Sequence, residues 1–421
     1  MNDGGRPEFV LAAVGTRGDI LPLIALGREL VSRGYRCHLL ANEPFADEAS
    51  AAGLRFMPVA PQQNNNITSL EHNLGTYLFP SYAPTFEYFQ REFPRGKRLV
   101  VVNMDNHSAS SSLADLYDAP ICRLYLAPFK IRSLIEPFWP LKGLCQGAIG
   151  RTFSKYTLPK IYAGWDTHAF SLENINRHRA EWGLPLVDNA RHPEARIRQH
   201  VALFPSWYCA PVADWPAPLE MTSFPLPSSS GALPPEFLAF VEREGKPLIF
   251  TPGTGVPDVA DFFQQARRCC EEVGLPGVFL SPHADATPGA YGSRVARFAY
   301  LDLEAVLRHA ALLVHHGGIG TTARAIQAGV PQIISPLAYD QPDNGHRVEG
   351  LGVGGVVQRI DFQRGLLASR VRELLASSDV RAALSRYQAL LAQSDAIGSA
   401  VDVLERAFAP EIASTRLSAA E

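Results

Sequence analysis

The segment His315–Asn344 constrains the fold of this chain more than any other, and it reads HHGGIGTTARAIQAGVPQIISPLAYDQPDN. The apolar run 311–314 precedes its two histidines, and a second apolar run, 332–335, lies about one helix length further on. Between them the glycine-rich run 317–322 permits a tight backbone turn and the start of a helix. This order of strand, turn, helix and strand predicts parallel strands in an α/β sheet.

The same segment carries polar groups at the edge where open α/β sheets bind ligands, outside the carboxyl ends of their strands. His316 follows the first strand, and the N–H groups and dipole of the helix that begins near Gly320 suit a diphosphate. Asp340 and Gln341 follow the second strand and can hold sugar hydroxyls. A glycine-rich turn alone is common in ordinary strand-to-helix connections, so the prediction of a nucleotide-sugar site depends on the whole combination.

Length and composition allow several globular domains and exclude some partners. The chain has 421 residues, of which 46% are hydrophobic, enough for two or three domains with sizeable cores. A net charge of −3 gives no indication of nucleic-acid binding. Six scattered cysteines without a CxxC pair are typical of a cytoplasmic, reducing compartment. We see neither a basic-then-apolar leader nor an uncharged run of about 18 apolar residues, so we expect no signal peptide and no membrane span.

Two α/β halves follow one another along the chain. The first half has apolar runs that predict strands at 9–14, 37–41, 99–104 and 121–126. The second half begins again with LIFTPGTG at 248–255, and the stretch between the halves is rich in Pro, Ser and Gly. We therefore predict a first domain at 1–222, a linker at 223–236, and a second domain at 237–399 that carries the nucleotide-sugar site.

The loop GTRGDILP, residues 15–22, places a carboxylate directly after the first strand. Asp19 can act as a general base that takes the proton of an acceptor hydroxyl, or it can stabilise the start of the following helix, and the two roles are compatible. Asp105 and His107 follow another strand of the same half. They either reach the same edge of the sheet or are ordinary polar residues of a surface loop.

These motifs resemble those of the UDP-glycosyltransferase superfamily, whose GT-B fold has two Rossmann-like α/β domains facing each other across a cleft. His316 and Asp340 are 24 residues apart (340 − 316), which is the spacing of that superfamily's donor motif. The sequence GTRGD is similar to the first loop of sterol glucosyltransferases and of natural-product glycosyltransferases. The segments 202–226 and 329–344 are similar to the bacterial rhamnosyltransferases of rhamnolipid synthesis. The resemblance covers most of the chain and is weak from about 62 to 195.

The resemblance implies an inverting glycosyltransferase that moves a hexose or deoxyhexose from a UDP- or dTDP-sugar to a hydroxyl of a hydrophobic acceptor. Asp19 would be the base, and neither a metal nor another cofactor is expected beside the nucleotide-sugar co-substrate. Arg324 stands where plant relatives have a ribose-binding Glu, which favours a deoxyribose donor, and Tyr300 stands where they stack a Trp on uracil. The resemblance leaves open which histidine contacts the diphosphate. The implied donor-binding residues are Thr254, Tyr300, His315, His316, Gly317, Gly318, Gly320, Thr321, Thr322, Asp340 and Gln341.

Alternatives within the same resemblance stay open. They are a rhamnosyltransferase of glycolipid synthesis that uses dTDP-rhamnose, an epimerase with the GT-B fold, and a non-catalytic sugar-nucleotide-binding protein. An amphipathic helical pattern spans 386–408. By resemblance, the last helix, at about 400–421, should pack back on the first domain.

The weakly similar part of the first half is aromatic and irregular, which suits a cleft for a hydrophobic acceptor such as a lipid, polyketide or phenol. Between Phe129 and Tyr162 six Lys or Arg residues accompany a single acid, Glu136. This excess predicts either contact with an anionic membrane, at its cytoplasmic face, or solvated helix faces over a core. The candidate residues of the acceptor cleft are Asp105, His107, Phe138 and Trp139.

Overall fold

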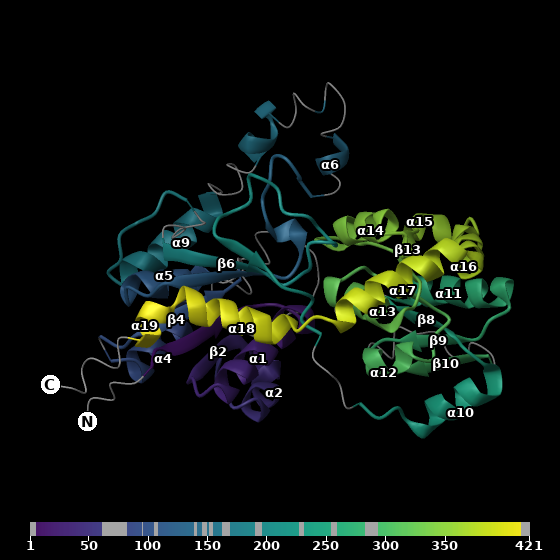
Figure 1. Cartoon of the computed structure of the whole chain (residues 1–421), viewed down its shortest axis with the longest axis horizontal. Coiled ribbons are helices and arrows are strands. Elements are labelled where there is room, and N and C mark those ends of the chain that lie inside the picture. Colours follow the sequence, from purple (N-terminus) through teal and green to yellow (C-terminus); the bar gives the residue numbers. More distant parts are fainter. Residues whose placement is uncertain are drawn as a thin grey trace. The chain divides into compact units, whose positions relative to one another are not determined.

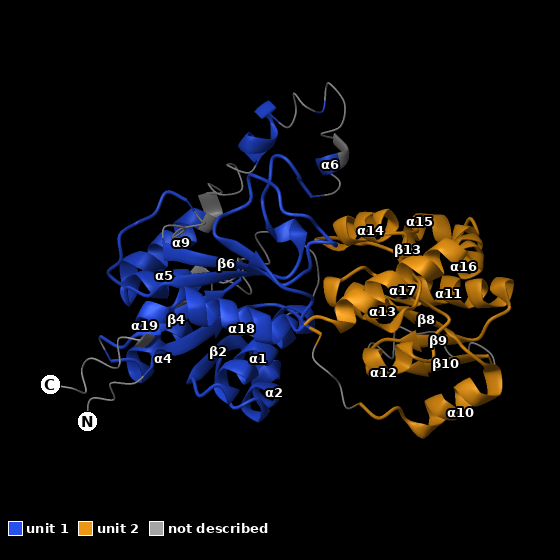
Figure 2. Cartoon of the chain, in the orientation of Figure 1, with its two compact units in different colours: residues 1–225, 395–421 blue, residues 226–394 orange. Residues whose placement is uncertain are grey.

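The chain forms two compact units, each of which contains one parallel sheet (Figures 1 and 2). Unit 1 comprises residues 1–225 and 395–421, and unit 2 comprises residues 226–394. The computed structural model describes residues 6–60, 82–94, 96–104, 108–138, 141–144, 150, 155–161, 169–189, 196–226, 231–253, 259–282 and 294–413.

Unit 1 has a seven-stranded sheet in the order β3-β2-β1-β4-β5-β6-β7, and every adjacent pair is parallel. The order reverses between β1 and β4, so the loops after these two strands flank the switch point where such sheets bind ligands. The strands are β1 (Glu8–Ala12), β2 (Cys37–Asn42), β3 (Arg55–Ala60), β4 (Leu99–Asn103), β5 (Ile121–Tyr125), β6 (Ile197–Ala202) and β7 (Leu219–Met221).

The central strands of this sheet are buried, because helices cover both of its faces, as in other parallel sheets. Phe89, Phe93 and Trp182 belong to the core cluster on one face. The helices of unit 1 are α1 (Arg17–Ser32), α2 (Ala46–Ala51), α4 (Tyr82–Glu92), α5 (Ser108–Leu116), α6 (Leu141–Leu144), α9 (Ala169–Glu181), α18 (Ala396–Ala407) and α19 (Ala409–Ala413), with 3-10 turns η1 (Glu43–Phe45) and η4 (Pro128–Lys130).

A buried polar cluster lies at the amino-terminal edge of this sheet. His38 on β2 bonds through Nε2 to Oε2 of Glu8 on β1 and through Nδ1 to the hydroxyl of Tyr88 on α4, both at 2.8 Å. Lys97 Nζ lies 2.8 Å from the other carboxylate oxygen of Glu8. The Glu8 carboxylate and the His38 ring therefore join β1, β2 and α4, and each oxygen of the carboxylate has a partner.

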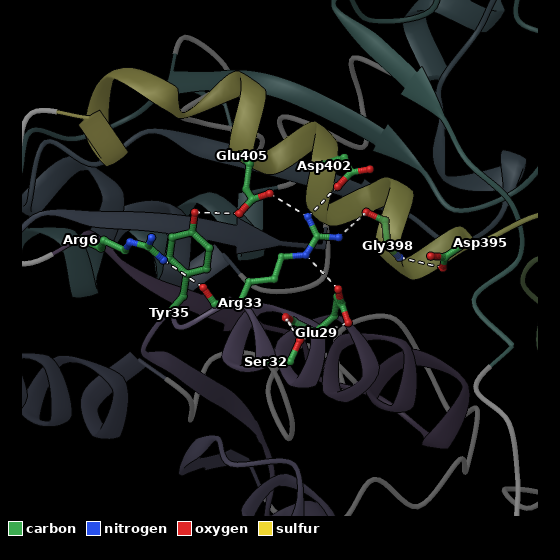
Figure 3. A network of polar contacts seen from close by, with 9 residues as sticks. All are labelled: Arg6, Glu29, Ser32, Arg33, Tyr35, Asp395, Gly398, Asp402 and Glu405. Carbon is green, nitrogen blue, oxygen red and sulfur yellow. Dashed lines mark hydrogen bonds and ion pairs between the residues drawn. The ribbon is translucent and has the colours of Figure 1, made fainter.

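The C-terminal helix α18 packs against α1 and β6, so the end of the chain belongs to unit 1 (Figure 2). Arg33, directly after α1, donates to Asp402 at 2.6 Å and to Glu405 at 2.7 Å (Figure 3). Tyr35 also donates to Glu405, at 2.9 Å, and Asp395 accepts from the backbone N–H of Gly398 at the start of α18. These contacts hold the returning helix in a fixed register on α1.

Unit 2 has a six-stranded parallel sheet in the order β10-β9-β8-β11-β12-β13, which reverses between β8 and β11. The strands are β8 (Leu248–Thr251), β9 (Gly277–Leu280), β10 (Val295–Phe298), β11 (Leu312–His315), β12 (Gln332–Ile334) and β13 (Gly354–Val356). The helices are α10 (Pro235–Glu244), α11 (Ala260–Val273), α12 (Leu303–Leu307), α13 (Ile319–Ala328), α14 (Gln341–Gly350), α15 (Arg359–Phe362), α16 (Leu366–Ala376) and α17 (Ser378–Ala392).

The predicted α/β class, with two parallel-sheet domains, is confirmed. The helical pattern predicted at 386–408 is confirmed for most of its length, but it belongs to two helices, because α17 ends at Ala392 and α18 begins at Ala396. Asp395 caps the second helix, and this cap ends the helical continuity. Within the described residues, no helix is long and apolar enough to cross a membrane.

Candidate active site

The turn between β11 and α13 places the start of a helix at the carboxyl edge of the unit 2 sheet. Gly317 has φ +99° and Gly318 is the N-cap residue without a side-chain cap. The first backbone bond of the helix runs from Thr322 N to Gly318 O at 3.0 Å. The N–H groups of Ile319, Gly320 and Thr321 precede that bond, so the helix itself supplies them no acceptor. This arrangement suits an anion such as a diphosphate.

The glycines of this turn are required by close packing. A Cβ on Gly317 would lie 2.6 Å from Cγ2 of Ile334, and a Cβ on Gly318 would lie 2.7 Å from Nε2 of His316. Both distances are shorter than non-bonded atoms tolerate. The turn can therefore pass close to β12 and to His316 only because these two positions have no side chain.

The two histidines face different surroundings. His315 is fully buried, lies 2.9 Å through Nε2 from Oε1 of Gln332, and accepts through Nδ1 from Gly317 N at 3.1 Å. Burial lowers the pKa of His315 to about 3, so its ring is neutral and supports the turn from inside. Because both ring nitrogens are engaged, His315 is placed to hold the turn rather than to touch a ligand.

His316 is only partly buried, and burial together with the nearby positive charge of Arg359 lowers its pKa to about 4. Its ring faces the loop after β8, where a Cβ on Gly253 would lie 3.1 Å from Nδ1 of His316. Nδ1 is enclosed and has no hydrogen-bond partner among the described residues. A neutral imidazole at this place can donate a hydrogen bond to a bound phosphate.

The acid–Gln pair lies beside the glycine turn. Asp340 Oδ2 accepts from Asn344 Nδ2 at 2.8 Å, and the same Nδ2 donates to Gly317 O at 2.9 Å. Gln341 Oε1 accepts from the backbone N–H groups of Leu337 and Ala338, at 2.7 and 3.2 Å. The structure thus brings together the two halves of the predicted donor motif, and Asn344, which sequence reasoning missed, joins them.

Tyr300 lies between β10 and α12, and 61% of its surface is exposed, so its ring can stack on a flat base. Arg324 on α13 donates to Glu304 of α12 at 3.0 Å and to Gln327 at 2.8 Å.

Thr322 is fully buried, and its hydroxyl donates to Gly318 O at 3.1 Å. Among these residues, Thr322 therefore stabilises the first turn of the helix, and its side chain does not face a ligand.

Asp19 is the third residue of α1, and a capping box formed with Thr16 holds its carboxylate. Oδ2 accepts from Thr16 N at 2.9 Å and from Thr16 Oγ1 at 3.2 Å, while Asp19 N donates to Thr16 O at 3.0 Å. Within the described part of unit 1, Oδ1 of Asp19 makes no hydrogen bond. Burial raises the pKa of Asp19, although the charge of Lys130 and the bonds from Thr16 lower it.

Most of the remaining predicted residues are not among those that the structure describes. Thr254, Asp105, His107 and Trp139 lie outside the described residues. Phe138 is partly buried and packs edge-on against Phe129, with ring centroids 4.6 Å apart.

The basic segment predicted at 129–162 includes a loop at 133–135, and the contacts of Asp214 with this loop were not predicted from the sequence. Asp214 accepts from the backbone N–H groups of Leu134 and Ile135 and from the hydroxyl of Ser133, at 2.6, 3.2 and 2.7 Å. The loop so fixed exposes two apolar side chains, Leu134 at 40% and Ile135 at 58%.

Two segments of the chain match family models. Residues 9–91 match the glycosyltransferase family 28 N-terminal domain, and residues 286–395 match the erythromycin biosynthesis protein CIII-like, C-terminal domain. The first segment includes Asp19, and the second includes the turn after β11 together with Asp340 and Gln341.

Related proteins align over most of this chain. An uncharacterized protein of Mycobacterium bovis is 26% identical over 94% of this chain and 96% of its own length. An uncharacterized glycosyltransferase of Mycobacterium leprae is 23% identical over 94% of this chain and 96% of its own length. A sterol 3-beta-glucosyltransferase of Leptosphaeria maculans is 24% identical over 85% of this chain, which corresponds to 26% of that protein.

Solved structures share the fold. The glycotransferase of kitacinnamycin has a TM-score of 0.70 and 21% identity, covering 96% of this chain and 99% of that one. The glycosyltransferase VinC in complex with dTDP has a TM-score of 0.67 and 19% identity, covering 95% of this chain and 99% of that one.

Proposed function

Since this chain is a glycosyltransferase of the UDP-glycosyltransferase superfamily with the GT-B fold, we propose that it transfers a hexose or deoxyhexose from a UDP- or dTDP-sugar to a hydroxyl of a hydrophobic acceptor. The observation that carries the proposal is the uncapped start of α13 joined through Asn344 to Asp340. That arrangement offers N–H donors for a diphosphate and a carboxylate for sugar hydroxyls within one continuous group of side chains.

In the proposed reaction, Asp19 takes the proton of the acceptor hydroxyl, and the acceptor oxygen attacks the anomeric carbon opposite the diphosphate. The new carbon–oxygen bond forms as the bond to the phosphate oxygen breaks, so the configuration at the anomeric carbon inverts. The N–H groups of α13 and the neutral ring of His316 stabilise the charge that develops on the diphosphate. Asp340 and the amide of Gln341 hold the sugar. This helix start supplies the positive potential that a metal ion would otherwise provide, and the nucleotide sugar is the only co-substrate proposed.

The nucleotide is proposed to be dTDP or UDP. Two solved relatives are bound to dTDP, namely VinC and the glycosyltransferase SsfS6 of Streptomyces sp. SF2575. Arg324 pairs with Glu304, and by the resemblance to the superfamily it stands where plant members have a ribose-binding Glu, which favours a deoxyribose. A rhamnosyltransferase that uses dTDP-rhamnose is the second candidate within this proposal, and sterols and other natural products are the acceptor classes that the relatives' names support.

The test follows the midpoint of thermal unfolding with UDP, dTDP, GDP and ADP added separately, because a ligand that binds only the folded state raises the midpoint. We expect a shift with dTDP or UDP and a smaller or absent shift with GDP and ADP. A larger shift with dTDP than with UDP supports a deoxysugar donor. No shift with any of the four contradicts the donor site.

We further propose a peripheral contact with the cytoplasmic face of an anionic membrane through the loop that Asp214 fixes. Leu134 and Ile135 are its exposed apolar tip, and Lys130 and Arg132 precede them in the chain and carry positive charge. Co-sedimentation with vesicles that contain phosphatidylglycerol should exceed that with phosphatidylcholine alone, and replacement of both tip residues by Ser should abolish the difference. Equal, negligible binding to both kinds of vesicle removes the membrane contact.

A further inference from the structure

Asn344 connects two parts of the donor site, the turn at Gly317 and the carboxylate of Asp340, and lies 27 residues after Gly317 in the chain. It is fully buried in the first turns of α14 and carries one donor group, the side-chain amide Nδ2. One bond runs to the carbonyl of Gly317, at 2.9 Å, and another to the carboxylate of Asp340, at 2.8 Å. The two hydrogens of an amide group suffice for both bonds.

The bond to Gly317 fixes the direction of a peptide group. In a trans peptide the carbonyl of one residue and the N–H of the next point to opposite sides. Because the Gly317 carbonyl points toward Asn344, the N–H of Gly318 points away from it. The N–H of Gly317 is itself held by Nδ1 of His315. Both peptide groups next to the φ +99° residue are therefore fixed by side chains, one from β11 and one from α14.

The bond to Asp340 fixes the carboxylate relative to the same turn. Packing keeps the two segments close, since a Cβ on Gly317 would lie 3.2 Å from the carbonyl oxygen of Gln341. Packing sets the distance between the segments, whereas the amide of Asn344 sets the orientation of the polar groups on each of them.

We infer that Asn344 is a positioning residue that holds the phosphate-binding turn in register with the sugar-binding carboxylate of Asp340. It touches neither the phosphate nor the sugar in this scheme, and it acts through Gly317 and Asp340. The inference rests on the proposed donor site and adds to it a coupling between phosphate binding and sugar binding.

The test compares binding of UDP and dTDP with binding of UDP-glucose and dTDP-glucose by calorimetry. The ratio of the two affinities reports the sugar contribution alone. Asn344→Leu, which keeps the volume and removes both donors, should change this ratio about tenfold, the effect of losing a hydrogen bond to a charged group. In an Asp340→Ala background the same substitution should change the ratio no further, because its target is gone. A full effect in that background overturns the inference, as does an unchanged ratio in the single variant.

Two further variants separate positioning from folding. Asp343→Asn alters the neighbouring buried residue, which pairs with Arg347 at 2.8 Å, and should lower the unfolding midpoint without altering the ratio. Asn344→Asp keeps the shape and places a second carboxyl beside Asp340. Its defect should lessen as the pH falls, because a shared proton restores one hydrogen bond between the two carboxyls. A defect that does not depend on pH contradicts the inference.

Failure of the inference and failure of the proposed function give different results. If the unaltered protein binds none of UDP, dTDP, UDP-glucose and dTDP-glucose, the proposed function is wrong. If it binds them and Asn344→Leu binds them with the same ratio, only the positioning role is wrong.

Discussion

At the scale of single residues, spacing predicted the kinds of group in the donor site but not their orientation. The sequence left open whether His315 or His316 contacts the diphosphate. In the structure His315 ends β11, is fully buried and bonds to Gln332, whereas His316 follows the strand and is partly buried. A buried Asn in an amphipathic helix carries no pattern of its own, and Asn344 was missed for that reason.

Gly15 tests whether the position of the Asp19 carboxylate matters. A Cβ on Gly15 would lie 2.3 Å from Oδ2 of Asp19, so Gly15→Ala should displace the carboxylate from Thr16 and cost about 1–3 kcal/mol of overpacking. Gly15→Ala should also lower turnover, by at least the factor that corresponds to its loss of stability. Gly18→Ala is the matched control in the same loop, since its Cβ would meet only Thr16 Oγ1, at 3.7 Å. Equal turnover of the two variants would show that the capping geometry has no part in catalysis.

Asp19 also predicts a pH dependence. Burial raises its pKa in the folded protein, and a base must be ionised to accept a proton. Turnover should therefore decline, as the pH falls, at a higher pH than an ordinary aspartate would dictate. Asp19→Asn should lower turnover by about 10²–10⁴-fold and abolish this acidic decline. A variant with near-normal turnover and the same pH profile would exclude Asp19 as the base.

At the scale of helices and strands, strand positions were predictable because buried parallel strands are short apolar runs, as in β1 and β4. The end of α17 was not predicted, because the apolar residues before and after the break were taken as one pattern, although residues 393–395 are Gln, Ser and Asp. The signal that periodicity overlooked is local: Asp395 stands three residues before Gly398, in the place of a helix cap.

Arg33 should contribute to the attachment of α18 on α1. Its guanidinium is one-quarter exposed and contacts two acids of α18 as well as Glu29 of α1, so we expect Arg33→Leu to lower the free energy of unfolding by about 1 kcal/mol, after discounting for solvent screening. Arg406→Leu, on α18, is the control. The ion pair of Arg406 with Glu220 is largely exposed and should contribute almost nothing to stability. Urea unfolding of both variants measures the difference, and equal midpoints would contradict the role of the Arg33 network.

At the scale of the whole molecule, the buried cluster around Glu8 should determine part of the acid stability. Burial raises the pKa of Glu8, but hydrogen bonds from His38 and Lys97 outweigh it and lower the pKa to about 2. A pKa below that of the unfolded chain, 4.5, means that the charged form stabilises the fold above that pH. This contribution, about 3 kcal/mol, is lost as the pH falls from 4.5 toward 2. Glu8→Gln should be much less stable than the unaltered protein at neutral pH, and the gap should narrow in acid. A gap that is constant with pH would contradict this origin.

The boundaries of the two units determine how this protein can be recombined with its relatives. Unit 1 is assembled from both ends of the chain, and unit 2 is the uninterrupted stretch 226–394. In a chimaera joined once, after residue 225, the C-terminal helix that packs on α1 would come from the other protein. Arg33 and Tyr35 would then no longer meet Asp402 and Glu405. Two cuts, with only the internal stretch exchanged, would keep Asp402 and Glu405 with their native partners. With the proposed donor site in unit 2, we expect donor preference to be transferred by exchange of the internal stretch 226–394 and not by exchange of everything after residue 225.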